Sequence, residues 1–194
     1  MDIGATPASE NEFRTRAISI YIGIAAVLLA ICTMAGGNAT KDAMRANIEA
    51  ANTWSFFQAR VIRRSLLELS SEDLALMQKS QPGLPETAQK LIAERIARNQ
   101  SIAKAYTSNP ERRDGADELF KKARELEAER DLALRRDPYF DYAQAMLQIS
   151  IVLASVAIIA GGSALIQVSI GLGMIGTLLM LNGFTLLTRI PGIG

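Results

Sequence analysis

Two regions of the chain are almost wholly apolar, and about 100 mostly polar residues separate them. Residues 17–37, AISIYIGIAAVLLAICTMAGG, carry no charge and at about 1.5 Å per residue would cover the roughly 30 Å of a bilayer core. The second apolar region is divided by Gly161 and Gly162, which can turn the chain, into residues 138–161 and 163–188. The pattern therefore predicts three transmembrane helices, the last two forming a tight hairpin.

Local signals place the ends of these spans. Asp137 and Pro138 form a helix start, with Asp as N-cap and Pro at the first helical position. Asn38 or Thr40 is expected to cap a new helix after the first span. Residues 1–16 are then a polar N-terminal tail and residues 189–194 a C-terminal tail, both outside the spans.

The segment 38–137 is rich in Ala, Leu, Glu and Arg, which predicts helix almost throughout. Its strongest loop signal is KSQPGLP, residues 79–85, so an outgoing and a returning helix should form a hairpin. Asn109-Pro110-Glu111 ends one returning helix and caps the next. The outgoing helix carries a heptad-like stripe, which comprises Ala43, Asn47, Ala50, Trp54, Phe57 and Val61. A break near Ser70 would instead give a compact three-helix bundle.

The predicted fold class is thus an all-α membrane protein, with three transmembrane helices and a coiled-coil-like helical hairpin inserted between spans 1 and 2. Within it, residues 171–176, GLGMIG, match the spacing of a dinucleotide-binding loop. They lack the preceding strand and the following acidic residue that such a loop requires. Because helices in lipid associate through small residues, the following are predicted helix-packing positions: Gly23, Ala30, Ala154, Gly161, Gly173, Gly176 and Gly183.

Composition narrows the chemistry. The net charge of +1 argues against nucleic acid as a partner. The absence of His and the single Cys rule out His/Cys zinc sites, His-dependent acid–base catalysis and an intramolecular disulfide. A carboxylate-only metal site at Glu125 and Glu129 is conceivable, but the sequence predicts no catalytic residue, no cofactor and no metal. It favours a protein that is not an enzyme.

The positive-inside rule suggests the orientation of the long segment. Basic residues near the membrane on its side are Lys41, Arg45, Arg124, Arg130, Arg135, Arg136 and Arg189. The N-terminal side has only Arg14 and Arg16. The helical segment is therefore expected on the cytoplasmic side.

With Asn38, Lys41 and Asn47 ahead of the run WSFFQARVIR (residues 54–63), the chain resembles an uncharacterised family of bacterial inner-membrane proteins, a domain-of-unknown-function family. Phe57 and Arg60 stand where that motif often has Tyr and Lys. The resemblance covers essentially the whole chain. It implies one N-terminal span, a long helical segment, two C-terminal spans and a bacterial cytoplasmic membrane, and it brings no catalytic residues.

The same motif has a physical interpretation of its own. Trp54, Phe57 and Val61 share a helical face, while Arg60 and Arg63 fall largely on others. The face is either a helix–helix core with a solvated edge or a docking face for a partner, because Trp and Arg dominate many interfaces.

These features predict a membrane-anchored helical scaffold, either self-assembling or an accessory subunit of a larger membrane complex. Its expected partners are the lipid bilayer and other copies or membrane subunits. The alternative is an oligomeric channel or transporter, with Gln167, Thr177 or Asn182 facing a pore.

Overall fold

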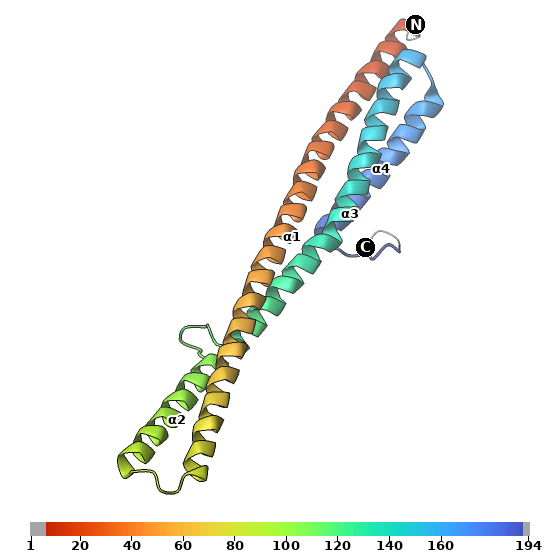
Figure 1. The fold of residues 1–194 in the computed structure, drawn as a ribbon. Coiled ribbons are helices and arrows are strands. Elements are labelled where there is room, and N and C mark those ends of the chain that lie inside the picture. The colour runs from red at the N-terminus through yellow and green to blue at the C-terminus, as the bar shows by residue number, and fades with distance from the viewer. Residues whose placement is uncertain (1–6, 192–194) are drawn as a thin grey trace. The chain divides into compact units, whose positions relative to one another are not determined.

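The computed structural model describes residues 7–191, which form four α-helices and no strand (Figure 1). The helices are α1 (Pro7–Ser80), α2 (Glu86–Thr107), α3 (Ala116–Ala160) and α4 (Ser163–Thr185). The all-α prediction is confirmed. Residues 1–6 and 192–194 of the two predicted tails lie outside the described residues.

The first helix does not stop where the apolar segment ends. Asn38 and Thr40 lie inside α1, so the predicted helix cap there is wrong. The Thr40 hydroxyl instead donates to the carbonyl of Gly36 at 3.1 Å, four residues back, which leaves the backbone ladder intact. At Ser71 the hydroxyl likewise donates to a carbonyl four residues back, that of Leu67, at 2.8 Å, and α1 continues past the possible break near Ser70.

The third helix starts earlier than the span it contains. Pro138 lies within α3, so Asp137 is not an N-cap, contrary to the sequence prediction. A proline inside a helix removes one backbone hydrogen bond, and the surrounding turns of α3 continue nonetheless. The Asp137 carboxylate lies 2.8 Å from the same Thr40 hydroxyl, whose single proton is shared between this carboxylate and the Gly36 carbonyl, and the contact ties α3 to α1.

Three of these helices are long and apolar enough to cross a membrane, judged by length and composition. The chain divides into two compact units. We call residues 7–43 and 131–191 the apolar unit and residues 44–130 the charged unit.

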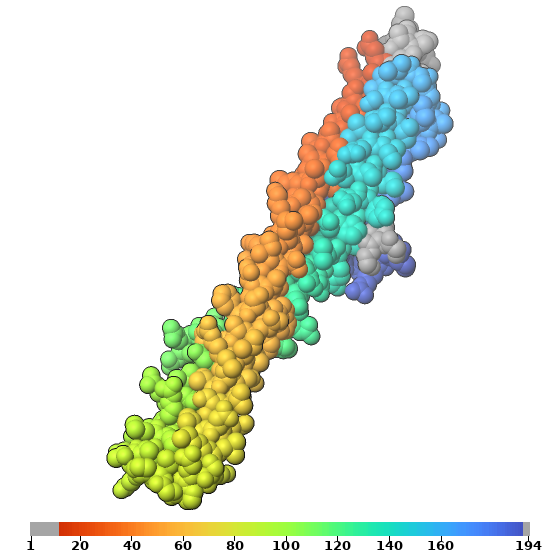
Figure 2. Space-filling view, viewed as in Figure 1, coloured from red at the N-terminus to blue at the C-terminus, as the bar shows by residue number. Residues whose placement is uncertain are grey.

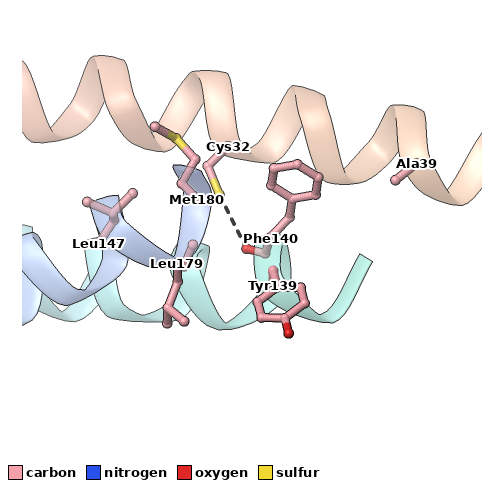
Figure 3. Packing of buried hydrophobic residues seen from close by; sticks show 8 residues of the cluster. Cys32, Ala39, Tyr139, Phe140, Leu147, Leu179 and Met180 are labelled. Atoms are coloured by element: carbon pink, nitrogen blue, oxygen red, sulfur yellow. Dashed lines mark hydrogen bonds between the residues drawn. The ribbon is translucent and has the colours of Figure 1, made fainter. Parts of the chain in front are cut away.

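In the apolar unit, the N-terminal part of α1 and the whole of α4 pack against the C-terminal part of α3. Figure 2 shows α1 (orange) lying against α3 (cyan) in this unit. Figure 3 shows the core, where Cys32 from α1 points toward Phe140 on α3 and its thiol donates to the Phe140 carbonyl at 3.3 Å. Leu179 and Met180 supply the contribution of α4 to the same core.

In the charged unit, α2 packs on the C-terminal part of α1, and the N-terminal part of α3 packs on the segment of α1 before it (Figure 1). The inner face of α1 follows alternating steps of 4 and 3 residues and consists of Ala46, Ala50, Thr53, Phe57, Arg60, Arg64, Leu67, Ser71, Leu74 and Gln78. Every one of these residues is buried or half-buried. This is the spacing of a helix that packs along a coiled-coil seam.

Candidate functional site

The most deeply buried polar groups of the apolar unit form one hydroxyl cluster. The Tyr21 hydroxyl on α1 lies 2.5 Å from the Ser150 hydroxyl on α3 and donates to the Ser169 carbonyl on α4 at 2.9 Å. The Ser169 hydroxyl donates to the Ser150 carbonyl at 2.7 Å. Both serines are fully buried. Three helices are thereby joined by hydroxyls that satisfy one another, which is how polar side chains act within apolar helix bundles.

Small residues make room for this cluster and for the contact below it. A β-carbon at Gly173 would collide with the Tyr21 hydroxyl, and one at Gly176 would lie 3.0 Å from Leu147 Cγ. At Gly183 it would lie 2.9 Å from Phe140 Cε1. Gly173 thus makes room for Tyr21 of α1 and Ser150 of α3, while Gly176 and Gly183 let α4 lie directly on α3.

The remaining predicted packing positions behave differently. Ala154 is fully buried on α3. Gly161 has a positive φ of 67° and forms the turn between α3 and α4, a conformation that glycine adopts without strain. Gly23 and Ala30 are exposed, and nothing lies within 4 Å of a β-carbon built at Gly23. Within one chain, α1 packs through Ala25 and Cys32 instead.

The C-terminal end of α4 is held by an amide. Asn182 Oδ1 accepts from the Thr188 backbone N–H at 3.0 Å, and its Nδ2 donates to the Thr188 carbonyl at 2.8 Å. The Tyr139 hydroxyl donates to that same carbonyl at 3.2 Å and accepts from the Ile190 N–H at 3.1 Å. Both ends of the Asn182 amide are thus engaged within the chain. Thr177 donates to the Gly173 carbonyl at 2.8 Å, and Gln167 is exposed.

In the charged unit, the sequence motif WSFFQARVIR lies at an aromatic cluster. The rings of Trp54 and Phe57 stand edge to face with centroids 5.4 Å apart, and Trp54 meets Phe120 of α3 in the same way at 5.5 Å. Such geometry contributes about 0.5–1.5 kcal/mol per pair beyond area burial. The indole N–H of Trp54 donates to the Glu127 carboxylate at 3.0 Å.

The Glu127 carboxylate is stabilised in its charged form. Arg124 donates to it at 3.0 Å. This hydrogen bond, followed by the one from Trp54, lowers the pKa of Glu127 below its ordinary range. Glu118 has a lowered pKa as well, because its carboxylate accepts from the Ser108 hydroxyl and from the Asn109 N–H ahead of α3. The third helix begins at Ala116, several residues after the cap that the sequence predicts at Asn109-Pro110-Glu111.

Arg60 joins all three helices of the charged unit. Its guanidinium pairs with the Asp114 carboxylate just before α3 and lies 4.8 Å from the centre of the Tyr106 ring on α2. Val61 is half-buried and Arg63 is exposed. Of the predicted partner-interface residues, Trp54, Phe57 and Arg60 therefore make contacts inside the chain.

Sequence reasoning missed the residues that complete both clusters. Tyr21, Phe120 and Glu127 come from helices far along the chain from the residues they meet. A tyrosine in the middle of an apolar span was a usable signal, because its hydroxyl needs a partner there. No comparable signal marks Phe120 among the other aromatic residues or Glu127 among the many acidic ones.

A groove of about 560 Å³ lies between α1 and α2 in the charged unit. Its lining includes Glu68, Glu72, Asn99 and Lys104.

Among residues 7–191, no group of three or more His, Cys, Asp and Glu side chains could hold a metal ion. Glu125 and Glu129, the conceivable carboxylate pair, are both exposed on α3.

The fold and these contacts define an all-α protein with three helices able to span a membrane. The chain belongs to the DUF4337 family, a domain of unknown function, whose family model matches residues 14–186. This confirms the resemblance to an uncharacterised family. No curated protein and no solved structure matches the chain.

Proposed function

We propose that this protein is a membrane-anchored helical scaffold, either self-assembling or an accessory subunit of a larger complex in a bacterial inner membrane. It anchors through three spans and extends a coiled-coil-like hairpin into the cytoplasm. The chemistry it performs is association with lipid and protein, not catalysis.

The observation that best supports this proposal is the Tyr21–Ser150–Ser169 cluster. Its hydroxyls bind one another and the backbone across three helices. The neighbouring glycines close the α3–α4 contact, and Asn182 fastens the end of α4. The polar groups of the apolar unit are thus used to hold helices together. A pore-facing role for Asn182 would require its amide to leave these bonds, so we favour the scaffold over the channel.

The test is native mass spectrometry on a tagged copy of the full chain, extracted from its own membrane in mild detergent. A mass at an integer multiple of 21.0 kDa supports a self-assembling scaffold, and stoichiometric foreign subunits support an accessory role. A protein that stays at 21.0 kDa and brings no partner contradicts both forms of the proposal. Ion flux through vesicles containing the purified protein, abolished by Asn182→Leu, would favour the channel.

A further inference from the structure

One face of α1 in the charged unit exposes a regular row of large aliphatic side chains. We call this row the outer seam. Its positions are separated by alternating steps of 4 and 3 residues, and they are Ile48, Asn52, Ser55, Ala59, Ile62, Leu66, Leu69, Asp73 and Leu76. Its large members, Ile48, Ile62, Leu66, Leu69 and Leu76, are all more than half exposed. Aliphatic side chains gathered on one solvated face mark an interaction surface.

The outer seam is more apolar than the face that the chain buries. The inner face includes Arg60, Arg64 and Gln78, whereas the outer seam over the same stretch of α1 includes Ile62, Leu66 and Leu76. In an isolated soluble hairpin the more apolar face would turn inward, because burying aliphatic surface is the main favourable term in packing. The inversion indicates that a partner covers the outer seam.

The period of the outer seam specifies the shape of that partner. A strict 4–3 repeat matches another α-helix running alongside in a supercoil. Asn52 occupies a seam position between Ile48 and Ser55. A single Asn at such a position pairs with its counterpart and fixes register between identical helices.

We propose that the outer seam binds the same seam of a second copy of this chain, in parallel and in register. The inference rests on the proposed membrane anchoring, since copies inserted the same way in one bilayer present α1 in the same direction. Each layer then meets itself: Ile62 faces Ile62, Leu66 faces Leu66 and Asn52 faces Asn52. Asp73 is the one charged residue in the seam, and it lies close to the end of the helix.

The area is sufficient for assembly within a membrane. Five aliphatic side chains at roughly 60–120 Å² each, the area that corresponds to about 1.5–3 kcal/mol per side chain, bury on the order of 500 Å² per copy. A standard interface buries about 800 Å² per partner. Confinement of both copies to one bilayer raises their effective concentration and offsets the difference. On the membrane part of α1, the exposed Gly23, Ala30 and Gly37 leave room for close approach.

The test is oxidative crosslinking of Leu69→Cys in native membranes, compared with Glu68→Cys. Glu68 is also exposed but points about 100° away around the helix. Both variants retain Cys32, which is buried. We expect a disulfide-linked pair of chains with Leu69→Cys and at least tenfold less with Glu68→Cys. Equal crosslinking by the two variants, or none by Leu69→Cys, overturns the proposal.

A second measurement separates this inference from the scaffold proposal. The double variant Ile62→Gln and Leu69→Gln should shift the native mass from a multiple of 21.0 kDa to 21.0 kDa with its helix content unchanged, because both side chains are exposed in the single chain. Leu91→Gln, an exposed position on α2, should leave the multiple intact. If Leu69→Cys crosslinks to a stoichiometric foreign subunit instead, the second-copy inference fails while the accessory-subunit proposal holds. A lone 21.0 kDa chain without crosslinks overturns both.

Discussion

In the apolar unit α4 lays Gly173, Gly176 and Gly183 against α3, whereas in the charged unit α1 lays Trp54 and Phe57 against α3. The first contact depends on glycines, which have no side chain and allow the helices to approach closely, whereas the second depends on large aromatic side chains. Lipid tails are as apolar as leucine, so helices within them gain from close approach more than from burial. In water, burying aromatic surface drives the contact. This difference is the one expected if the apolar unit lies in lipid, as we propose, and the charged unit lies in water.

The largest expected effect breaks the glycine contact. Gly183→Leu places a side chain where the Phe140 ring lies, 2.9 Å from the position of its β-carbon. Overpacking at such a site should cost about 3 kcal/mol, measured by denaturant unfolding of the purified protein in detergent, followed by circular dichroism. Gly171→Leu on the same helix is the control, since nothing lies within 4 Å of that site. Equal stability of the two variants would contradict the α3–α4 packing.

The next effect tests the aromatic cluster. Trp54→Ala removes two ring contacts and the hydrogen bond to Glu127. For a half-buried tryptophan we expect a loss of about 2 kcal/mol in unfolding free energy. Phe56→Ala is matched in position and type but alters a ring that is 67% exposed. A Phe56 variant as unstable as the Trp54 variant would show that the cluster does not stabilise the charged unit.

A smaller effect sharpens the account of the apolar unit. Tyr21→Phe keeps the ring and removes the hydroxyl that links α1 to Ser150 and Ser169. The expected loss is about 1 kcal/mol, measured in the same unfolding assay. Tyr142→Phe, at a tyrosine that is 46% exposed, should have little effect. A Tyr21→Phe variant as stable as the unmodified protein would mean that the Tyr21 hydroxyl does not stabilise the apolar unit and that Ser150 and Ser169 suffice to hold its helices together.

The smallest effect depends on pH. The pKa of Glu127 is lowered in the folded protein by Arg124 and then Trp54. Its contribution to stability is therefore present above the unfolded pKa of about 4.3 and is lost as pH falls through the lower folded pKa. Glu127→Gln should reduce the drop in melting temperature on acidification to about pH 3. Glu129→Gln, exposed on the same helix, should not. If Glu127→Gln leaves the acid-induced drop in melting temperature unchanged, the charged form of Glu127 does not contribute to stability.

The sequence predicted helix content, the loop at 79–85 and the Gly161–Gly162 turn well, because propensity and turn residues act locally. It failed at Thr40 and Pro138, where strong local end signals lie inside continuous helices. A hydroxyl can bond to a carbonyl four residues back as readily as it caps a new helix, so sequence alone does not separate the two outcomes. At Pro138 the packing of Tyr139 and Phe140 carries α3 onward.

The site residues divide along the same line. Gly173, Gly176 and Gly183 were found because a helical repeat marks one face. Gly23 and Ala30 share that repeat, yet they lie on a face that α1 does not use within one chain. Periodicity identifies a face but not its occupant. Which helix covers it depends on side chains from distant parts of the chain, such as Tyr21 and Phe120.

The connection between α3 and α4 also affects how the protein is made. Only Gly161 and Gly162 separate the two helices, which is too short for a stretch of chain to wait in water between two insertion events. The proposed second and third spans are therefore expected to enter the bilayer together, as a helical hairpin. Biosynthesis of the membrane anchor then has two steps, α1 first and the α3–α4 pair second, with the entire charged unit translated in between.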